Sequence, residues 1–278
     1  MRIPFRKMHG LGNDFVVIDR RDAKLAGWPA MTAARAAALA DRQTGVGCDQ
    51  VIVLEPSARA DVWMRIYNPD GGEVESCGNA ARAVGMLLAQ DTEAAEITIE
   101  TSGGLLTVRA DAQGIAVDMG APRFDWDAIP LAYAMDTRHM PVGWDDLADP
   151  AAVNVGNPHV VFTVPDVDAV ELARLGPLIE TDLLFPHRVN VNVLSVAGPD
   201  HIAVRVWERG AGLTRACGTG ACASAVVAIR RKLVTSPVRV SLPGGDLRIA
   251  WAPGGSITMT GPAALTFEGT FDDAQFPV

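Results

Sequence analysis

A chain of 278 residues, 49% of them hydrophobic, is long enough to form two domains with separate cores. Its formal net charge of −9 argues against a nucleic-acid or membrane-surface partner, because both need a basic face. No apolar run approaches the ~20 residues that span a bilayer, and the N-terminal residues lack the apolar core of a secretion signal. We therefore expect a cytoplasmic protein.

The apolar pattern predicts alternating strands and helices. Strands are predicted where apolar residues alternate over short runs, at Phe15–Asp19, Val51–Leu54, Val62–Tyr67, Ile97–Glu100 and Leu105–Arg109. The alanine-rich stretch Thr32–Asp41 predicts a helix with Thr32 as its N-cap. A second helix is predicted from Cys77-Gly78-Asn79 to about Gln90, and its small side chains suit burial against a sheet.

The chain repeats itself at a spacing of 140 residues. Four pairs of segments keep this register: Gln50–Leu54 with Asn190–Leu194, Met64–Asn68 with Val204–Glu208, Cys77-Gly78-Asn79 with Cys217-Gly218-Thr219, and Val117–Pro122 with Ile257–Pro262. At a spacing of 144, Gly12–Val17 also resembles Gly156–Val161. Ordered matches at a nearly constant spacing indicate duplication. We therefore expect two pseudo-symmetric domains of the α/β (α+β) class with the same element order.

The two halves join near Gly120-Ala121-Pro122. This junction gives an N-terminal half of residues 1–120 and a C-terminal half of residues 121–263. The Pro- and Asp-rich run Asp136–Pro150 predicts an exposed loop at the start of the second half.

The cysteine at the start of each repeated helix, Cys77 or Cys217, is placed to be reactive. The glycine that follows leaves backbone N–H groups free, and these groups and the positive end of the helix dipole favour an anion. The same field lowers the pKa of a thiol from its usual value of about 8.5 and favours the thiolate. A substrate carboxylate held by both helices would have one sulfur on each face of its α-carbon. That arrangement inverts a stereocentre by removing a proton on one side and returning one on the other.

The cysteines also allow less reactive interpretations. Each could be a small buried residue, the usual fate of a lone cysteine, but equivalent placement in a repeat argues against this for both. Cys48 and Cys222 lack that context and are expected to pack structurally. A metal site lacks a C-x-x-C pair or clustered histidines. None of the three lysines lies in a glycine-rich context suited to pyridoxal phosphate, so we expect no metal and no cofactor.

Polar residues recur at strand ends in both halves. Asn13, Asn68, Asn157 and Asn190 hold such positions, and Glu208 aligns with Asn68. A single asparagine is more often a turn or a cap, but the recurrence indicates a shared polar cleft. Arg209 offers a bidentate clamp for a carboxylate. His159 could orient or tune a thiol, although a lone histidine is as often structural.

Seven segments resemble the diaminopimelate epimerase family: Lys7–Phe15, Gly45–Gln50, Tyr67–Asn79, Gly156–His159, Arg188–Asn190, Glu208–Gly210 and Ala216–Ala221. The resemblance runs over nearly the whole chain. It implies a cofactor-independent isomerase that interconverts LL- and meso-2,6-diaminopimelate in lysine and peptidoglycan precursor biosynthesis. It also implies two domains, each a mostly antiparallel sheet wrapped around a central helix. Residues 264–278 would return to the first domain, and the enzyme would be a homodimer.

The family pattern also implies roles for individual residues. Cys77 and Cys217 would be the acid–base thiols, and amides around Gly78-Asn79 and Gly218-Thr219 would hold the reacting carboxylate. The remaining groups would bind the distant end of the substrate (Asn68, Asn157, Asn190 and Arg209) or complete the pocket (Asn13, Gln50, Glu208 and His159). The sequence departs from the pattern at Ala80, where the family usually has glycine, and at Ser76, Ala83 and Leu213. None of these changes removes a catalytic group.

Three other functions are compatible with paired cysteines. A proline or hydroxyproline racemase, or the related isomerase of phenazine synthesis, would use the same scaffold. Neither would need a clamp for a second amino-acid end. A thiol–disulfide redox protein would use the two cysteines in exchange. A non-enzymatic amino-acid binding protein would have no need of two activated thiols.

Overall fold

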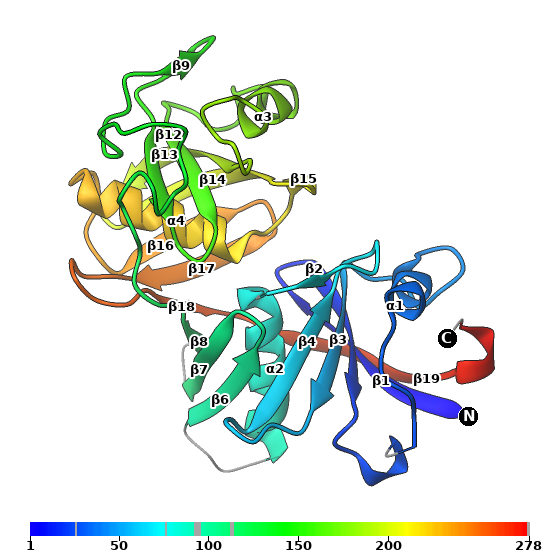
Figure 1. Ribbon diagram of the computed structural model, residues 1–278. Helices are drawn as coiled ribbons and strands as arrows, with labels where there is room; N and C mark the ends of the chain where they lie inside the picture. The colour runs from blue at the N-terminus through cyan, green and yellow to red at the C-terminus, as the bar shows by residue number, and fades with distance from the viewer. Residues whose placement is uncertain (26, 76, 92–95, 112–113, 277–278) are drawn as a thin grey trace. The chain divides into compact units, whose positions relative to one another are not determined.

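The computed structural model describes residues 1–25, 27–75, 77–91, 96–111 and 114–276, and the chain divides into two compact units. Unit 1 comprises Met1–Val117 and Gly261–Val278, and unit 2 comprises Asp118–Thr260 (Figure 1). The chain therefore leaves unit 1, forms unit 2 and returns to unit 1. Within the described residues, no helix is both long and apolar enough to cross a bilayer.

Unit 1 is built on a mostly antiparallel sheet. Its strands lie in the order β19 (Ala264–Asp272), β1 (Arg2–Gly10), β2 (Asn13–Asp19), β3 (Gln50–Glu55), β4 (Val62–Tyr67), β6 (Glu96–Thr101), β7 (Gly104–Asp111) and β8 (Gly114–Asp118). The short strand β5 (Glu73–Val74) also pairs with β4. The pairs β2–β3 and β4–β6 are parallel. Parallel neighbours need a crossover, which α1 (Ala33–Ala40) and α2 (Gly78–Asp91) supply.

Unit 2 repeats this plan. Its strands are β11 (Ala151–Asn154), β12 (Pro158–Thr163), β13 (Asn190–Gly198), β14 (His201–Glu208), β16 (Val238–Leu242), β17 (Gly245–Ala250) and β18 (Thr258–Gly261), with β15 (Gly212–Thr214) on β14. The pairs β12–β13 and β14–β16 are parallel and are joined through α3 (Leu172–Glu180) and α4 (Gly218–Arg230). The pairings correspond to those of unit 1, and the predicted fold class is confirmed.

Each unit packs its sheet against one helix of small residues. Helix α2 contacts β1, β6 and β7 (Figure 1). Helix α4 contacts β11, β12, β13, β14, β16 and β17. The side chains of Ala80, Ala81 and Ala83 are buried in α2. A Cβ added at Gly85 would lie 2.3 Å from Cγ1 of Val108, so β7 can approach α2 this closely only because residue 85 is glycine.

The predicted strands and helices of unit 1 are confirmed. The five predicted strands lie within β2, β3, β4, β6 and β7. Helix α1 begins after Thr32, whose Oγ1 accepts a hydrogen bond of 3.2 Å from the backbone N–H of Arg35. This is the predicted N-cap. Strand β1, which begins at Arg2 and pairs with β2 and β19, was not predicted.

The prediction of an exposed loop over Asp136–Pro150 is wrong in part. The segment contains a hairpin of β9 (Gly143–Trp144) and β10 (Leu147–Ala148), and Met140 and Leu147 are buried. Trp144 stacks on Phe185 with ring centroids 6.1 Å apart. Its large apolar residues therefore anchor the segment to the core of unit 2.

Candidate active site

Cys77 lies directly before α2 in unit 1. Its carbonyl accepts the first helical hydrogen bond, from Ala81 N at 2.9 Å, and its side chain is partly exposed. The sulfur lies 3.9 Å from Oδ1 of Asn13, which also accepts a hydrogen bond of 3.0 Å from Nδ2 of Asn79. Three predicted site residues of unit 1 therefore meet at one helix start. Ser76, which departs from the family pattern, lies outside the described residues.

A charged network behind Asn13 holds it in place. Nδ2 of Asn13 donates to Oδ2 of Asp49 at 3.0 Å, and Arg42 binds both Asp49 and Asp14 at 2.7 and 2.6 Å. Lys7 also pairs with Asp14 at 2.5 Å. Burial opposes ionisation of Asp14, but hydrogen bonds from Arg42 and Lys7 outweigh it and lower its pKa to about 2.

This low pKa gives a testable contribution to stability. A carboxyl whose pKa is depressed by folding stabilises the fold above the pKa of the unfolded chain. That stabilisation is lost as the pH falls through the folded value. For Asp14 the window runs from 3.8 down to about 2. Because the Asp14 side chain is still 17% exposed and solvent screens part of the interaction, we expect about 1 kcal/mol.

The measurement is the free energy of unfolding in urea at pH 5 and pH 2.5, for the wild type and Asp14→Asn. The difference between the two proteins should shrink at the lower pH. A difference that stays constant would contradict the assigned pKa. Other acidic groups titrate in both proteins, so their contributions cancel.

Gln50 and Asn68 form a second polar pair at the same end of the sheet. Gln50 opens β3 opposite Phe15 of β2, and Asn68 follows the last residue of β4. Nε2 of Gln50 donates to Oδ1 of Asn68 at 3.0 Å. The strand register thus places both predicted residues near the strand end that carries Asn13.

Cys217 is the N-cap of α4 in unit 2. Its extended backbone lets Sγ accept a hydrogen bond of 3.3 Å from Gly220 N, and Oγ1 of Thr219 lies 3.5 Å from the same sulfur. A Cβ added at Gly220 would lie 2.7 Å from Oδ1 of Asn192 and 2.8 Å from Cγ2 of Val206. The absence of a side chain at residue 220 therefore allows the sulfur to approach the helix start.

The prediction that the helix start lowers the pKa of the thiol and favours the thiolate is wrong for Cys217. Its side chain is 4% exposed, and burial raises the pKa of the thiol well above its ordinary value. The Glu208 carboxylate raises the pKa further, whereas hydrogen bonds from Thr219 and Gly220 lower it. Loss of solvation outweighs the helix field because a buried thiolate has exchanged water for few donors. Cys217 therefore holds its proton.

The other predicted residues of unit 2 surround this thiol or lie along the same strand ends. Oγ1 of Thr214 donates to Glu208 at 2.5 Å. The Asn190 side chain donates to Pro158 O at 2.8 Å and accepts from Arg209 N at 3.0 Å. The Arg209 side chain is exposed and donates to His187 O at 3.0 Å.

A buried chain of side chains leads from the sheet to Thr219. His159, which is fully buried, contacts Oδ1 of Asn157 through Nε2 at 2.8 Å, and Asn157 donates to Thr219 at 3.4 Å. On its other side, Nδ1 of His159 lies 3.1 Å from Nδ2 of Asn192. Burial lowers the pKa of His159 to about 3; the contact with Asn192 raises it and the charge of Arg209 lowers it, and burial outweighs both, so the ring is neutral. Sequence reasoning missed Asn192, although a second asparagine in the apolar run 190–194 was a visible signal.

The remaining cysteines pack as predicted, since Cys48 and Cys222 are buried free thiols. Burial raises the pKa of Cys48 to about 11. In the part of the chain that the structure describes, no cluster of three His, Cys, Asp or Glu residues is arranged to hold a metal ion.

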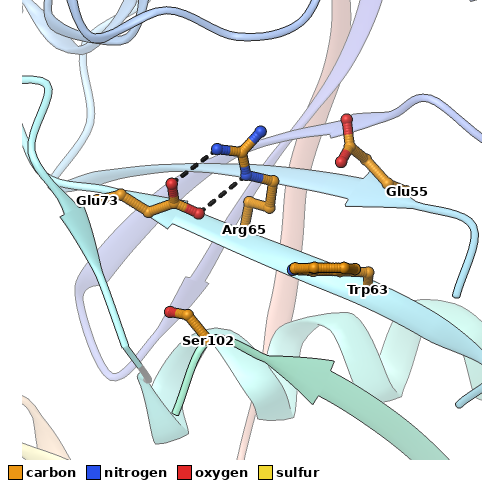
Figure 2. A pocket seen from close by; sticks show the side chains of 5 residues that line it. All are labelled: Glu55, Trp63, Arg65, Glu73 and Ser102. Atoms are coloured by element: carbon orange, nitrogen blue, oxygen red, sulfur yellow. Dashed lines mark hydrogen bonds and ion pairs between the residues drawn. The ribbon is translucent and has the colours of Figure 1, made fainter. Parts of the chain in front are cut away.

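A cavity of about 460 Å³ in unit 1 lies among Glu55, Trp63, Arg65, Glu73 and Ser102. Figure 2 shows the Arg65 guanidinium turned toward Glu73, with two hydrogen bonds of 2.9 and 2.7 Å. Glu55 is likewise paired, with Arg20. The cavity contains no predicted site residue, and each of its charged groups is already paired.

Solved structures share this fold at low sequence identity. A phenazine biosynthesis protein of the PhzF family from Enterococcus faecalis matches with a TM-score of 0.72 and 13% identity, over 98% of this chain and 100% of that one. A hydroxyproline epimerase from Agrobacterium vitis, with bound trans-4-hydroxy-L-proline, matches with a TM-score of 0.66 and 15% identity, over 99% and 94%. The fold class is therefore that of the PhzF and proline racemase proteins.

Sequence relatives define the family within that class. The sequence model for diaminopimelate epimerase matches residues 5–124 and 151–266. The diaminopimelate epimerases of Rhizorhabdus wittichii and Erythrobacter litoralis are 63% and 62% identical, covering 99% and 98% of this chain and 98% of each relative. This chain belongs to the diaminopimelate epimerase family.

Proposed function

We propose that the protein interconverts LL- and meso-2,6-diaminopimelate, with Cys77 and Cys217 as the acid–base pair. The observation that carries the proposal is a cysteine at the start of the central helix in both units of a diaminopimelate epimerase family member. The identity to relatives of that name is 62–63% over nearly the whole chain, whereas the racemase and PhzF structures are 13–15% identical. This difference favours diaminopimelate over a ring substrate.

The difficult step is loss of a proton from the α-carbon, because the resulting carbanion is a strong base. Backbone N–H groups at a helix start have no partner within the helix and favour an anion. In α4, Gly220 N binds the sulfur, and in the proposed mechanism the N–H groups of Gly218 and Thr219, which come earlier in the same helix start, are the donors toward a carboxylate. Such fixed donors stabilise the charge that develops on the carboxylate as the proton leaves.

Proton transfer requires one thiolate and one thiol in each turnover. Because burial raises the pKa of Cys217 and favours its thiol form, we assign Cys217 as the acid and Cys77 as the base in this direction of the reaction. The Cys77 thiolate takes the α-proton, and the Cys217 thiol gives its own proton to the opposite face of the carbon. The product leaves Cys77 protonated and Cys217 ionised, and the reverse reaction exchanges the roles.

Solvent deuterium tests this mechanism directly. LL-diaminopimelate incubated with the enzyme in D₂O should give meso product carrying deuterium at the inverted α-carbon, because the donor thiol exchanges with solvent. Mass spectrometry of the product measures the label. Meso product that retains its original hydrogen would exclude proton exchange with a thiol. L-Proline is the control substrate and should not be racemised.

A cytoplasmic homodimer also forms part of the proposal. Family resemblance supports the dimer, and free thiols at all four cysteines suit a reducing compartment. Membership of the family supports a small-molecule substrate whatever the oligomeric state or the compartment.

A further inference from the structure

The side chains behind Cys217 form an unbroken line of hydrogen bonds. The line runs from Asn192 through His159, Asn157 and Thr219 to the sulfur, with successive separations of 3.1, 2.8, 3.4 and 3.5 Å. We propose that Asn192 is a positioning residue that orients every donor in this line toward Cys217. The inference rests on the proposed function, because it gives the line a role in proton transfer at that thiol.

The direction of the line is set at Asn192. Its Nδ2 lies 3.0 Å from Val160 O and 3.3 Å from Asn190 O, which are both acceptors, so the amide nitrogen faces them. The amide nitrogen cannot accept a hydrogen bond, so a hydrogen on Nδ1 of His159 would face a donor group and have no acceptor there. The neutral ring must carry its hydrogen on Nε2.

Each later link follows from the histidine tautomer. Nε2–H donates to Oδ1 of Asn157, which turns the amide nitrogen of Asn157 toward Thr219. Oγ1 of Thr219 then accepts from Asn157, and its own hydrogen is left for the sulfur. The hydroxyl joins Gly220 N–H as a donor to Cys217, so the buried sulfur can carry a negative charge after it has given up its proton.

The duplicated unit shows that packing alone does not require this polar pair. Parallel pairing matches Val17 with Ile52 in unit 1 and Val161 with Asn192 in unit 2, so Ile52 is the counterpart of Asn192. In the same registers, Phe15 is the counterpart of His159. Phe15 and Ile52 are both fully buried. Unit 1 thus fills with apolar side chains the two positions that carry the hydrogen-bond line in unit 2.

The oxygen of the Asn192 amide also indicates that this residue is not there for packing. Oδ1 of Asn192 is buried and makes no hydrogen bond within the described residues, a loss that isoleucine would avoid. The nitrogen end of the amide is therefore the end that matters, since its two N–H groups face the three acceptor positions at Val160 O, Asn190 O and His159 Nδ1.

Two substitutions of Asn192 separate its effect on the direction of the hydrogen bonds from its effect on packing. Asn192→Asp keeps the size of the side chain but replaces the donor with an acceptor, so His159 should move its hydrogen to Nδ1 and the line should reverse. Asn192→Ile copies the unit 1 residue and removes the donor without supplying an acceptor. Ser224→Ala is the matched control, because Ser224 is also fully buried in unit 2 and its hydroxyl has no partner among the described residues.

The primary readout is the ¹⁵N spectrum of histidine-labelled protein without substrate, with the His159 signals assigned by comparison with His159→Gln. The wild type and Ser224→Ala should show Nε2–H, and Asn192→Asp should show Nδ1–H. We expect kcat to fall at least tenfold in Asn192→Asp and Asn192→Ile, and to stay unchanged in Ser224→Ala.

Two outcomes would overturn the inference: an Nδ1–H tautomer in the wild type, or wild-type kcat in folded Asn192→Ile. Because the tautomer is read without substrate, it is independent of the proposed function. A wild-type protein that shows Nε2–H but does not epimerise diaminopimelate would contradict the proposed function alone.

Discussion

Replacing either Cys77 or Cys217 with alanine is expected to abolish epimerisation, with kcat reduced by about 10³-fold or more. Each turnover needs a base and an acid, and alanine removes one of them while leaving the helix N–H groups in place. KM should change much less than kcat, because the sulfurs act on the proton and do not hold the carboxylate. The assay is the rate of conversion of LL to meso isomer, with KM from the same progress curves.

The chain supplies a matched control for the buried thiol. Cys222 lies on the same helix as Cys217 and is fully buried, so Cys222→Ala removes an equivalent atom without touching the proposed chemistry. We expect near wild-type kcat in Cys222→Ala, with a small loss of stability from the cavity. Full activity in Cys77→Ala or Cys217→Ala would refute the two-thiol mechanism.

Gly220→Ala is expected to lower kcat by about 10²-fold, because the new methyl group displaces the Cys217 thiol by up to about 1 Å. The new Cβ would lie 2.7 Å from Oδ1 of Asn192, 2.8 Å from Cγ2 of Val206 and 3.2 Å from Sγ of Cys217. Two of these neighbours are packed in the sheet, so the helix start has to shift. Overpacking of this kind costs about 1–3 kcal/mol of unfolding free energy.

The equivalent position in unit 1, Ala80, provides the control for Gly220→Ala. Ala80 follows Cys77 by three residues, as Gly220 follows Cys217, and its methyl group is fully buried in unit 1. Ala80→Gly should therefore leave kcat close to the wild-type value and cost about 1 kcal/mol of helix stability. Steady-state kinetics and urea unfolding of both variants give the result. Equal losses of kcat in the two would show that glycine is not specifically needed beside Cys217.

The repeat made most of the fold predictable. Segments that match at a spacing of 140 must form equivalent elements, so weak strand patterns in one half support those in the other. The cysteine–glycine segments marked both central helices, and α2 and α4 begin at Gly78 and Gly218. Helix α3 was not predicted, although Leu172, Leu175 and Ile179 recur at helical spacing and are buried.

The state of the Cys217 thiol could not be predicted from its neighbours in the sequence. A helix start lowers a thiol pKa, but burial acts against it, and the depth of burial depends on the sheet of unit 2 wrapping around α4. Asn192 was missed for a related reason. Its role depends on the parallel register of β12 and β13, which brings it beside a histidine 33 residues away.

The return of β19 to unit 1 determines when each unit can fold during synthesis. Strand β1 pairs with β19 from Arg2 with Asp272 to His9 with Ala264, so β1 waits for a partner strand that is made after the whole of unit 2. Until then β1 presents an unpaired edge, the feature by which nascent chains aggregate. Unit 2 is continuous from Asp118 to Thr260 and can fold first. Unit 1, which has chain segments on both sides of unit 2, is thus the unit that is completed later.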